Sequence, residues 1–530
     1  MPTQDRTGQH AIDPDASPAR QRSILLIASL VSSLVMLDSN VVAVALPTIS
    51  RSLGADFADM QWVITAYVLT FAALLLAAGS FADRVGRRRA ALIGQSLFAL
   101  ASLGCGLATT PLMLNLSRAV QGAGASLLLT AALAIINHSF QGAARAKAYA
   151  FWGASLGIAI TCGPIIGGVI SSAFGWSWAF LINLPICAVL VGATLKVIPE
   201  SRDPEAKRFD IAGVLSFSSG LFLLTWAVID GNALGWLAPA VLWRSGGGVA
   251  LLAVFVLVEQ RQARPMVDFA ALRSANFAGA AFAMLGYAAG AQVMIFYLPL
   301  YLQNAYGFAP AAAGLAMLPF ALPMFLVPRF GARLGWPSRS LLCLGLGISA
   351  LANAAMALLA NGQAAYLPFA LAMVVAGTGA GLLNGETAKT LQGALPAQRS
   401  GMASGVSGTV RFSALLFGVA GLGAMLISTT ASRFALAAQA WGLNGTLVLA
   451  VAKRFAAGDH GAALLALPAP LREPAGEALR RAFDAGFGAA AWTAAGVALF
   501  ALLATRALMP GPESTASARS SAEILVVPGE

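Results

Sequence analysis

Charged residues are scarce in this sequence: Asp, Glu, Lys and Arg make up only 10% of its 530 residues, whereas 58% are hydrophobic. The mean hydropathy is +0.76. A chain of this length would usually divide into about three or four soluble domains. So little charge excludes that arrangement and is typical of a protein that crosses a membrane many times.

Motifs of several enzyme classes are also missing. The chain has three histidines and four cysteines, and no two cysteines have the CxxC spacing of a metal or redox site. Neither the P-loop pattern GxxxxGK[ST] nor the zinc pattern HExxH occurs. We therefore expect no metal, no other cofactor, no ATP hydrolysis and no enzymatic activity in this chain.

Long apolar runs fill most of the sequence. A helix that crosses a bilayer needs about 20 apolar residues, and we therefore predict an all-α polytopic membrane protein with 14 transmembrane helices. The predicted helices lie near residues 24–46, 62–82, 90–108, 112–136, 149–172, 178–198, 211–229, 240–258, 277–300, 311–328, 340–360, 365–387, 404–427 and 486–508.

The basic residues predict the orientation of these helices. Nearly all lysines and arginines of the short connecting loops fall on one side, whereas the short loops on the other side hold only Arg51 and Arg244. Basic loops stay in the cytoplasm, so both termini are predicted to be cytoplasmic. The net charge of +11 is thereby explained by orientation in the lipid bilayer, and no nucleic-acid partner is expected.

A faint internal repeat indicates two related halves. The segment 331–339 aligns with 82–90 at a constant offset, which places Gly335 on Gly86. We therefore predict two six-helix bundles with two additional helices inserted between them. The predicted parts are a cytoplasmic N-terminal tail (1–23), a first bundle (24–198), a linker with two helices (199–275), a second bundle (276–508) with a partly helical outer insertion (428–484), and a cytoplasmic tail (509–530).

The segment 79–90, GSFADRVGRRRA, places one acid and four arginines between two apolar runs. Its glycines permit close helix approach and a tight turn, and its acid can pair with an arginine or face the N-terminus of another helix. We predict a salt-bridged latch that breaks when the bundles move; the alternative is a static basic anchor. The residues assigned to this gating motif are Gly79, Asp83, Arg84, Gly86, Arg87 and Arg88.

The pattern G-x-x-A-D-R-x-G-R-R in this segment resembles the signature loop of the major facilitator superfamily. Three further segments resemble motifs of its proton-coupled drug-efflux branch with 14 spans: LDSNVVAVALPTI with Asp38, LNLSRAVQGAGAS with Arg118, and CGPIIGG in the fifth run. FLINLP at 180–185 extends the likeness. These motifs cover most of the first 215 residues in the order of that branch.

The resemblance implies a transporter in a bacterial-type cytoplasmic (inner) membrane. It implies efflux of amphipathic drugs or toxic organic compounds, often cationic, in exchange for protons. The second half matches less well, because Phe412 and Ser413 stand where Gln and a small residue are common. Ala159 also stands where the fifth-run motif often has Gly. Substrate preference therefore transfers less well than the fold.

Asp38 lies past the middle of the first apolar run. An ionised carboxyl near the bilayer centre costs about 3 kcal/mol on insertion scales, so it must face a cavity or a partner. Burial favours the protonated carboxyl, which makes Asp38 the first choice for proton coupling; a structural hydrogen bond is the alternative. Arg118 keeps its proton, and it either tunes a nearby carboxyl or pairs with a backbone carbonyl.

The fifth run holds a second gating motif. A Gly-Pro pair is expected to break this helix, and small residues permit close packing against a neighbour. A static kink is the alternative. The residues of this motif are Gly163, Pro164, Gly167 and Gly168.

Two charges in the second half have open roles. Glu386, near the cytoplasmic end of its run, is a further candidate for proton coupling, although a solvated position fits equally well. Arg411 lies inside a run and requires either a buried partner or an anionic group of the substrate. The predicted substrate pathway consists of Asn40, Gln121, Asn384 and Arg411.

Several other functions fit the same features. The chain could export one endogenous metabolite or import a nutrient with protons; a membrane-embedded lipid enzyme and a non-transporting scaffold are remoter alternatives. The expected partners are a small-molecule substrate, protons and the lipid bilayer. No feature of the sequence identifies an envelope adaptor protein.

Overall fold

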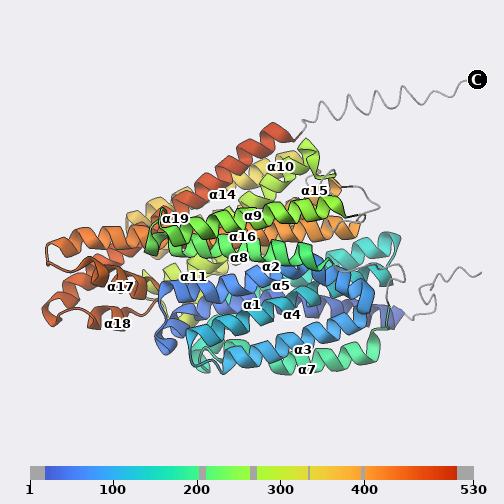
Figure 1. The fold of residues 1–530 in the computed structure, drawn as a ribbon, viewed down its shortest axis with the longest axis horizontal. Coiled ribbons are helices and arrows are strands. Elements are labelled where there is room, and N and C mark those ends of the chain that lie inside the picture. The colour runs from blue at the N-terminus through green and yellow to red at the C-terminus, as the bar shows by residue number, and fades with distance from the viewer. Residues whose placement is uncertain (1–17, 202–209, 263–270, 332–334, 396–399, 510–530) are drawn as a thin grey trace, which may run out of the picture.

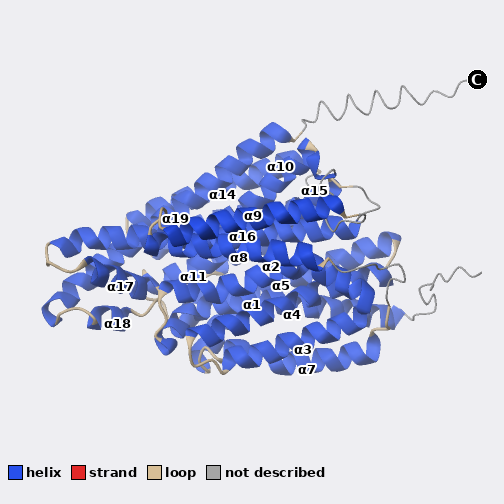
Figure 2. Ribbon diagram, in the orientation of Figure 1, coloured by secondary structure: helices blue, strands red, loops and turns tan. Residues whose placement is uncertain are grey.

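The computed structural model describes residues 18–201, 210–262, 271–331, 335–395 and 400–509, and every regular element in these ranges is a helix (Figure 2). The all-α prediction is confirmed. By length and composition, 13 of the described helices or helix pairs could cross a membrane. The protein is therefore a multi-pass membrane protein.

The first half of the chain forms seven helices, two of which share one span. They are α1 (Pro18–Leu53), α2 (Phe57–Val85), α3 (Arg87–Gly106), α4 (Pro111–Ser139), α5 (Gly142–Ala173), α6 (Trp178–Leu181) and α7 (Asn183–Val197). Two acidic residues set the start of α2. The backbone N–H of Asp59 donates to the carboxylate of Asp56 at 2.9 Å, and the backbone N–H of Asp56 donates to the carboxylate of Asp59 at 3.1 Å. This capping box satisfies N–H groups that lack partners in the first turn.

Helix α3 is the one predicted span that does not meet the hydropathy criterion among the described residues. Three arginines occupy its first turn, and Gln95 and Ser102 further dilute its apolar content. It nevertheless packs along α4 and α7 (Figure 1). The total of 14 spans therefore stays a prediction.

Two helices follow the first half, α8 (Ile211–Leu234) and α9 (Pro239–Arg261). They pack against each other, and α8 contacts both α2 and α16 (Figure 1). A pair of helices thus stands beside both halves, in the place expected for an insertion.

The second half contains interrupted helices. They are η1 (Ala271–Arg273), α10 (Ala275–Leu285), the π-helix η2 (Gly286–Gln292), α11 (Met294–Asn304), α12 (Pro310–Ala316), α13 (Leu318–Gly331), α14 (Ser338–Asn361), α15 (Tyr366–Gly393), α16 (Ser400–Gln439), α17 (Gly445–Ala456), α18 (His460–Leu465), η4 (Ala469–Leu471) and α19 (Arg472–Leu508). The halves meet where α2 packs on α16, α1 on α11, and α5 on α12 and α13. A site between these helices draws on both halves.

The short elements α17, α18 and η4 form a helical cap at one end of the molecule (Figure 1). Nζ of Lys453 in the cap lies 3.8 Å from Oδ2 of Asp56 in the first half. The side-chain amide of Asn304 in the second half donates to the carbonyl of Ala456 at 3.0 Å. Segment 428–484 is helical as predicted, and its cap contacts both halves.

Two related turns lie at the end opposite to the cap. Gly86 joins α2 to α3 with φ +113°, and Gly335 precedes α14 with φ +64°. Glycine adopts positive φ without the strain that a side chain adds. The proposed repeat therefore places a left-handed glycine at the equivalent turn of each half; Arg333 of that repeat lies outside the described residues.

Candidate functional site

The centre of the first half holds a buried ion pair. Nη1 of Arg118 in α4 lies 2.7 Å from Oδ2 of Asp38 in α1, and the two side chains are 2% and 0% exposed. Nε of Arg118 donates to the carbonyl of Val63 in α2 at 3.0 Å. Both partners considered for Arg118, a carboxyl and a backbone carbonyl, are therefore present together.

Three further polar groups complete the surroundings of Asp38. Its Oδ1 accepts from Nε2 of Gln121 at 2.9 Å and from Nδ2 of Asn183 at 2.7 Å. Ser102 in α3 accepts from both amides, at 2.8 and 3.2 Å. All groups bonded to Asp38 are donors, which suits an ionised carboxylate because that group only accepts. The network joins α1, α3, α4 and α7.

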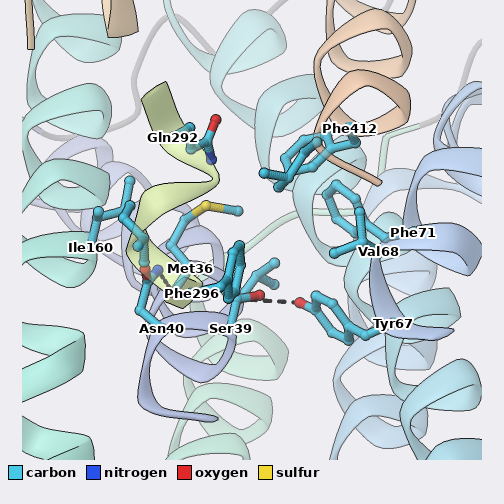
Figure 3. Close-up of a pocket in the computed structure, with 13 residues that line it drawn as sticks. Met36, Ser39, Asn40, Tyr67, Val68, Phe71, Ile160, Gln292, Phe296 and Phe412 are labelled. Atoms are coloured by element: carbon cyan, nitrogen blue, oxygen red, sulfur yellow. Dashed lines mark hydrogen bonds between the residues drawn. The ribbon is translucent and has the colours of Figure 1, made fainter. Parts of the chain in front are cut away.

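Tyr67 in α2 separates this network from a cavity. The guanidinium carbon of Arg118 lies 4.1 Å from the centre of the Tyr67 ring, and the Tyr67 hydroxyl donates to the carbonyl of Val35 at 3.3 Å. Tyr67 also lines the cavity, whereas Asp38 and Arg118 do not (Figure 3). The ion pair is thus one aromatic ring away from the cavity.

The cavity lies between the two halves of the molecule. Residues of α1, α2 and α5 line it together with residues of η2, α11 and α16 (Figure 3). Its lining consists of Val35, Met36, Ser39, Asn40, Tyr67, Val68, Phe71, Ile160, Gln292, Ile295, Phe296, Phe412 and Leu415.

A second polar cluster surrounds Arg411 in α16. Nε of Arg411 donates to Oε1 of Gln292 at 3.0 Å. Its Nη2 lies 3.2 Å from both the Tyr287 hydroxyl and Oδ1 of Asn384. The Tyr287 hydroxyl also donates to Asn384 at 2.8 Å. The cluster reaches the cavity through Gln292.

The π-helix η2 sets the geometry of this cluster. Tyr287 and Gln292 both lie in its seven residues. The wider backbone of a π-helix frequently occurs at functional sites. The side-chain amide of Asn353 in α14 donates to the carbonyl of Gly290 at 2.8 Å, which satisfies a buried group of this segment.

Comparisons with known proteins fit this arrangement of two halves around a cavity. Residues 28–419 match the family described as Major Facilitator Superfamily. The chain belongs to the Major Facilitator Superfamily. It is therefore a transporter rather than an enzyme.

Two relatives and one solved structure illustrate the match. The multidrug resistance protein Stp of Mycobacterium tuberculosis is 34% identical, over 77% of this chain and 76% of Stp. The multidrug efflux pump LfrA of Mycolicibacterium smegmatis is 31% identical, over 92% of this chain and 95% of LfrA. A bacterial homologue of the human lysosomal transporter Spinster has a TM-score of 0.59 at 17% identity, over 94% of this chain and 100% of that chain. The last likeness supports the fold alone.

The signature turn between α2 and α3 contacts the end of α7 and the residues that follow it. The backbone N–H of Arg88 lies 3.2 Å from Oε1 of Glu200, and its Nη2 donates to the carbonyl of Leu195 at 2.7 Å. The N–H of Arg87 donates to the carbonyl of Ser201 at 2.8 Å. These contacts reach Leu195, Glu200 and Ser201 and not the second half, and the latch stays a prediction.

The glycines of this turn differ from each other. A Cβ on Gly86 would stand 2.3 Å from Oε1 of Glu200, which explains the glycine there. Among the described residues, no atom lies within 4 Å of a Cβ built on Gly79, so the close helix approach expected there has no contact behind it. Arg84 is exposed in the last turn of α2, and the side chain of Asp83 lies outside the described residues.

The fifth-run motif packs closely, but α5 is continuous through Pro164, so the predicted helix break is wrong. A Cβ on Gly163 would stand 2.5 Å from Cβ of Asn40, and one on Gly167 would stand 2.6 Å from the carbonyl oxygen of Val41. A Cβ on Gly168 would stand 2.4 Å from the carbonyl oxygen of Pro310. The motif therefore brings α5 against α1 and against α12 of the other half.

Three other predicted residues have definite positions. Asn40 lines the cavity, and its side-chain amide donates to the carbonyl of Met36 at 2.6 Å. Gln121 belongs to the Asp38 network and does not line the cavity, and its assignment to the substrate pathway stays a prediction. Glu386 lies 3.1 Å from Nζ of Lys389 in its own helix. Among the described residues, the Asp38 carboxylate is bonded to Arg118, Gln121 and Asn183 and not to Glu386.

Sequence reasoning missed five residues of the two clusters. Ser102 and Asn183 are polar residues within apolar runs, and that pattern was the available signal. Tyr67 and Tyr287 are aromatic residues within apolar runs, where aromatics are common in the core and at the membrane interface, and Gln292 is a single polar residue in such a run. Each gains its role from contacts between helices, which are remote in sequence.

Proposed function

We propose that this protein exports amphipathic organic compounds in exchange for protons, by alternating access to a cavity between its two halves. The main support is the buried ion pair of Asp38 and Arg118. The ring of Tyr67, which lines the cavity, packs against Arg118 of this pair. The relatives named as multidrug resistance and efflux proteins support the substrate class.

A proton on Asp38 would change its hydrogen bonds. A protonated carboxyl must donate one bond, yet all three groups around Asp38 are donors. One donor must then leave, and the electrostatic attraction to Arg118 is lost. Protonation therefore loosens a network that joins four helices of the first half.

This coupling gives the order of events. A proton entering from outside neutralises Asp38, the loosened first half favours release of the substrate, and the proton passes to the cytoplasm before the next substrate binds. In this proposal Arg118 weakens proton binding at Asp38, and Glu386 is a secondary proton site. The glycines of the signature turn and of α5 act as pivots between inward and outward states.

The orientation is part of the proposal. The cap faces outward and both termini face the cytoplasm of a bacterial-type inner membrane, because the arginines of the Gly86 turn lie at the opposite end from the cap.

The test compares dye efflux from cells that express the wild type, Asp38→Asn or Asp230→Asn, with and without a protonophore. Asp230 is the matched control, because its carboxylate pairs with Arg244 at 2.7 Å in α8 and α9 and lies outside the cavity lining. We expect efflux in the wild type and in Asp230→Asn, and its loss with the protonophore or in Asp38→Asn. Protonophore-sensitive efflux that persists in Asp38→Asn would refute the mechanism. Absence of efflux for every dye at normal expression would favour a narrow metabolite transporter.

A further inference from the structure

The cavity has a lining without any charged residue. Its polar members, Ser39, Asn40, Tyr67 and Gln292, are all neutral at physiological pH. Asp38, the acid next to Ser39 in the chain, does not line the cavity and is already paired with Arg118. A cationic compound would therefore find no free carboxylate in the cavity wall.

Arg411 stands beside this neutral lining with an uncompensated charge. It bonds to Gln292, and its guanidinium carbon lies 5.8 Å from the centre of the Phe412 ring; both residues line the cavity. Its hydrogen-bond acceptors are an amide, a hydroxyl and a second amide. Among the residues that the structure describes, no Asp or Glu lies within ion-pair distance of Arg411.

The arginine also keeps capacity for another ligand. Its bonds use Nε and Nη2, and Nη1 has no acceptor among the described residues. A guanidinium offers five N–H donors in a planar fork that matches a carboxylate. The neutral side chains of Tyr287 and Gln292 in η2 and Asn384 in α15 position the guanidinium beside the cavity and leave its positive charge uncompensated.

An unpaired charge within a membrane-spanning helix is costly, and such residues mark substrate or ion pathways. We infer that Arg411 is the anion-binding residue of the cavity, so that the substrates are amphipathic organic anions. Their acidic group lies at Arg411, and their apolar body packs against Phe71, Phe296 and Phe412. The inference rests on the proposed function in taking this cavity as the substrate site, and it replaces the cationic class that the family resemblance implied.

The test measures binding of three probes of one shape to the purified full-length protein. The probes are naphthalene-2-carboxylate, the neutral naphthalene-2-carboxamide and the cationic naphthalen-2-ylmethylammonium. We expect the wild type to bind the carboxylate at least about tenfold more tightly than the other two, as a charged hydrogen-bonded contact provides. Equal affinities, or tightest binding of the ammonium, would overturn the inference without any variant.

Variants locate the anion site. Arg411→Gln is expected to weaken carboxylate binding about tenfold or more and to change amide binding less than about threefold. Arg411→Lys keeps the charge and should retain part of the preference. Arg244→Gln is the matched control, because Arg244 already has Asp230 as its partner. An equal loss of carboxylate and amide binding in Arg411→Gln would show a merely structural arginine and overturn the inference.

Probe binding to the purified protein needs no proton gradient. The anion site and the proton-coupled efflux function can therefore be refuted independently of each other. A carboxylate preference in a protein that exports none of the probes would refute the efflux function and keep the anion site. Proton-coupled export of the ammonium in preference to the carboxylate would refute the anion site and keep the efflux function.

Discussion

Nη1 of Arg118 and Oδ2 of Asp38 lie 2.7 Å apart on helices that are remote in sequence, and neither side chain is more than 2% exposed. Removing one partner of a buried ion pair leaves the other charge unpaired, which costs about 3 to 5 kcal/mol. The pair therefore matters to stability as well as to coupling.

A double-mutant cycle measures how much of this stability comes from the direct interaction between the two side chains. Asp38→Asn and Arg118→Gln should each destabilise the protein strongly, and the double variant should lose about 1 to 3 kcal/mol less than the sum of both. Unfolding in mixed micelles measures the stability. The partly exposed pair Asp230–Arg244 serves as the control, with an expected coupling below about 1 kcal/mol. Full additivity at Asp38 and Arg118 would contradict a direct pair.

Replacing Tyr67 tests the barrier between the cavity and the ion pair. Tyr67→Ala should remove the buried ring that lies 4.1 Å from Arg118, at a cost of about 3 to 5 kcal/mol, and admit water to Asp38. Proton flux into proteoliposomes without substrate should then rise. Tyr67→Phe keeps the ring and should resemble the wild type. An unchanged flux in Tyr67→Ala would show that the ring is not the barrier.

The contact between α5 and α12 is sensitive to a single methyl group. In Gly168→Ala the new Cβ would stand 2.4 Å from the carbonyl oxygen of Pro310, so the halves must separate at this point. We expect a destabilisation of about 1 to 3 kcal/mol, as for overpacking, and reduced transport. Gly192→Ala in α7 meets nothing within 4 Å and should be neutral or stabilising by up to about 1 kcal/mol. Wild-type transport in Gly168→Ala would contradict a close contact here.

The cap should lose stability in acid through His460. Burial, together with the nearby Arg51, lowers the pKa of His460 below its ordinary 6.5, while Asp459 opposes the shift. Its Nε2 is buried without a hydrogen-bond partner, and its ring stacks on Phe455. A histidine with a lowered folded-state pKa binds more protons when unfolded, so stability falls as pH decreases below 6.5. Thermal unfolding between about pH 7.5 and 5 should show this loss, and His460→Gln should reduce it.

The transmembrane helices were predictable because the length of an apolar run shows whether it can cross the bilayer as a helix. Side-chain contacts between helices were harder to predict. A membrane helix is apolar on every face, so its sequence does not show which face packs inside the protein and which faces lipid. Asp38 and Arg118 were each singled out, yet nothing in their spacing showed that they meet. Two neighbours of Arg411, Tyr287 and Gln292, come from a π-helix, whose backbone departs from the periodicity on which sequence patterns rest. At Gly79 the sequence predicted a close contact that the described residues do not make.

The lack of a carboxylate partner for Arg411 among the described residues has an electrical consequence. The empty cavity carries one positive charge, and a bound monoanion makes it neutral. A membrane voltage then does little work on the step that carries the substrate. It acts on the return step, in which Arg411 has no bound anion and Asp38 carries a proton, by up to about 2.3 kcal/mol per 100 mV for each charge that crosses the whole field. The turnover rate should therefore depend on voltage mainly when substrate is saturating, because the return step then limits the cycle.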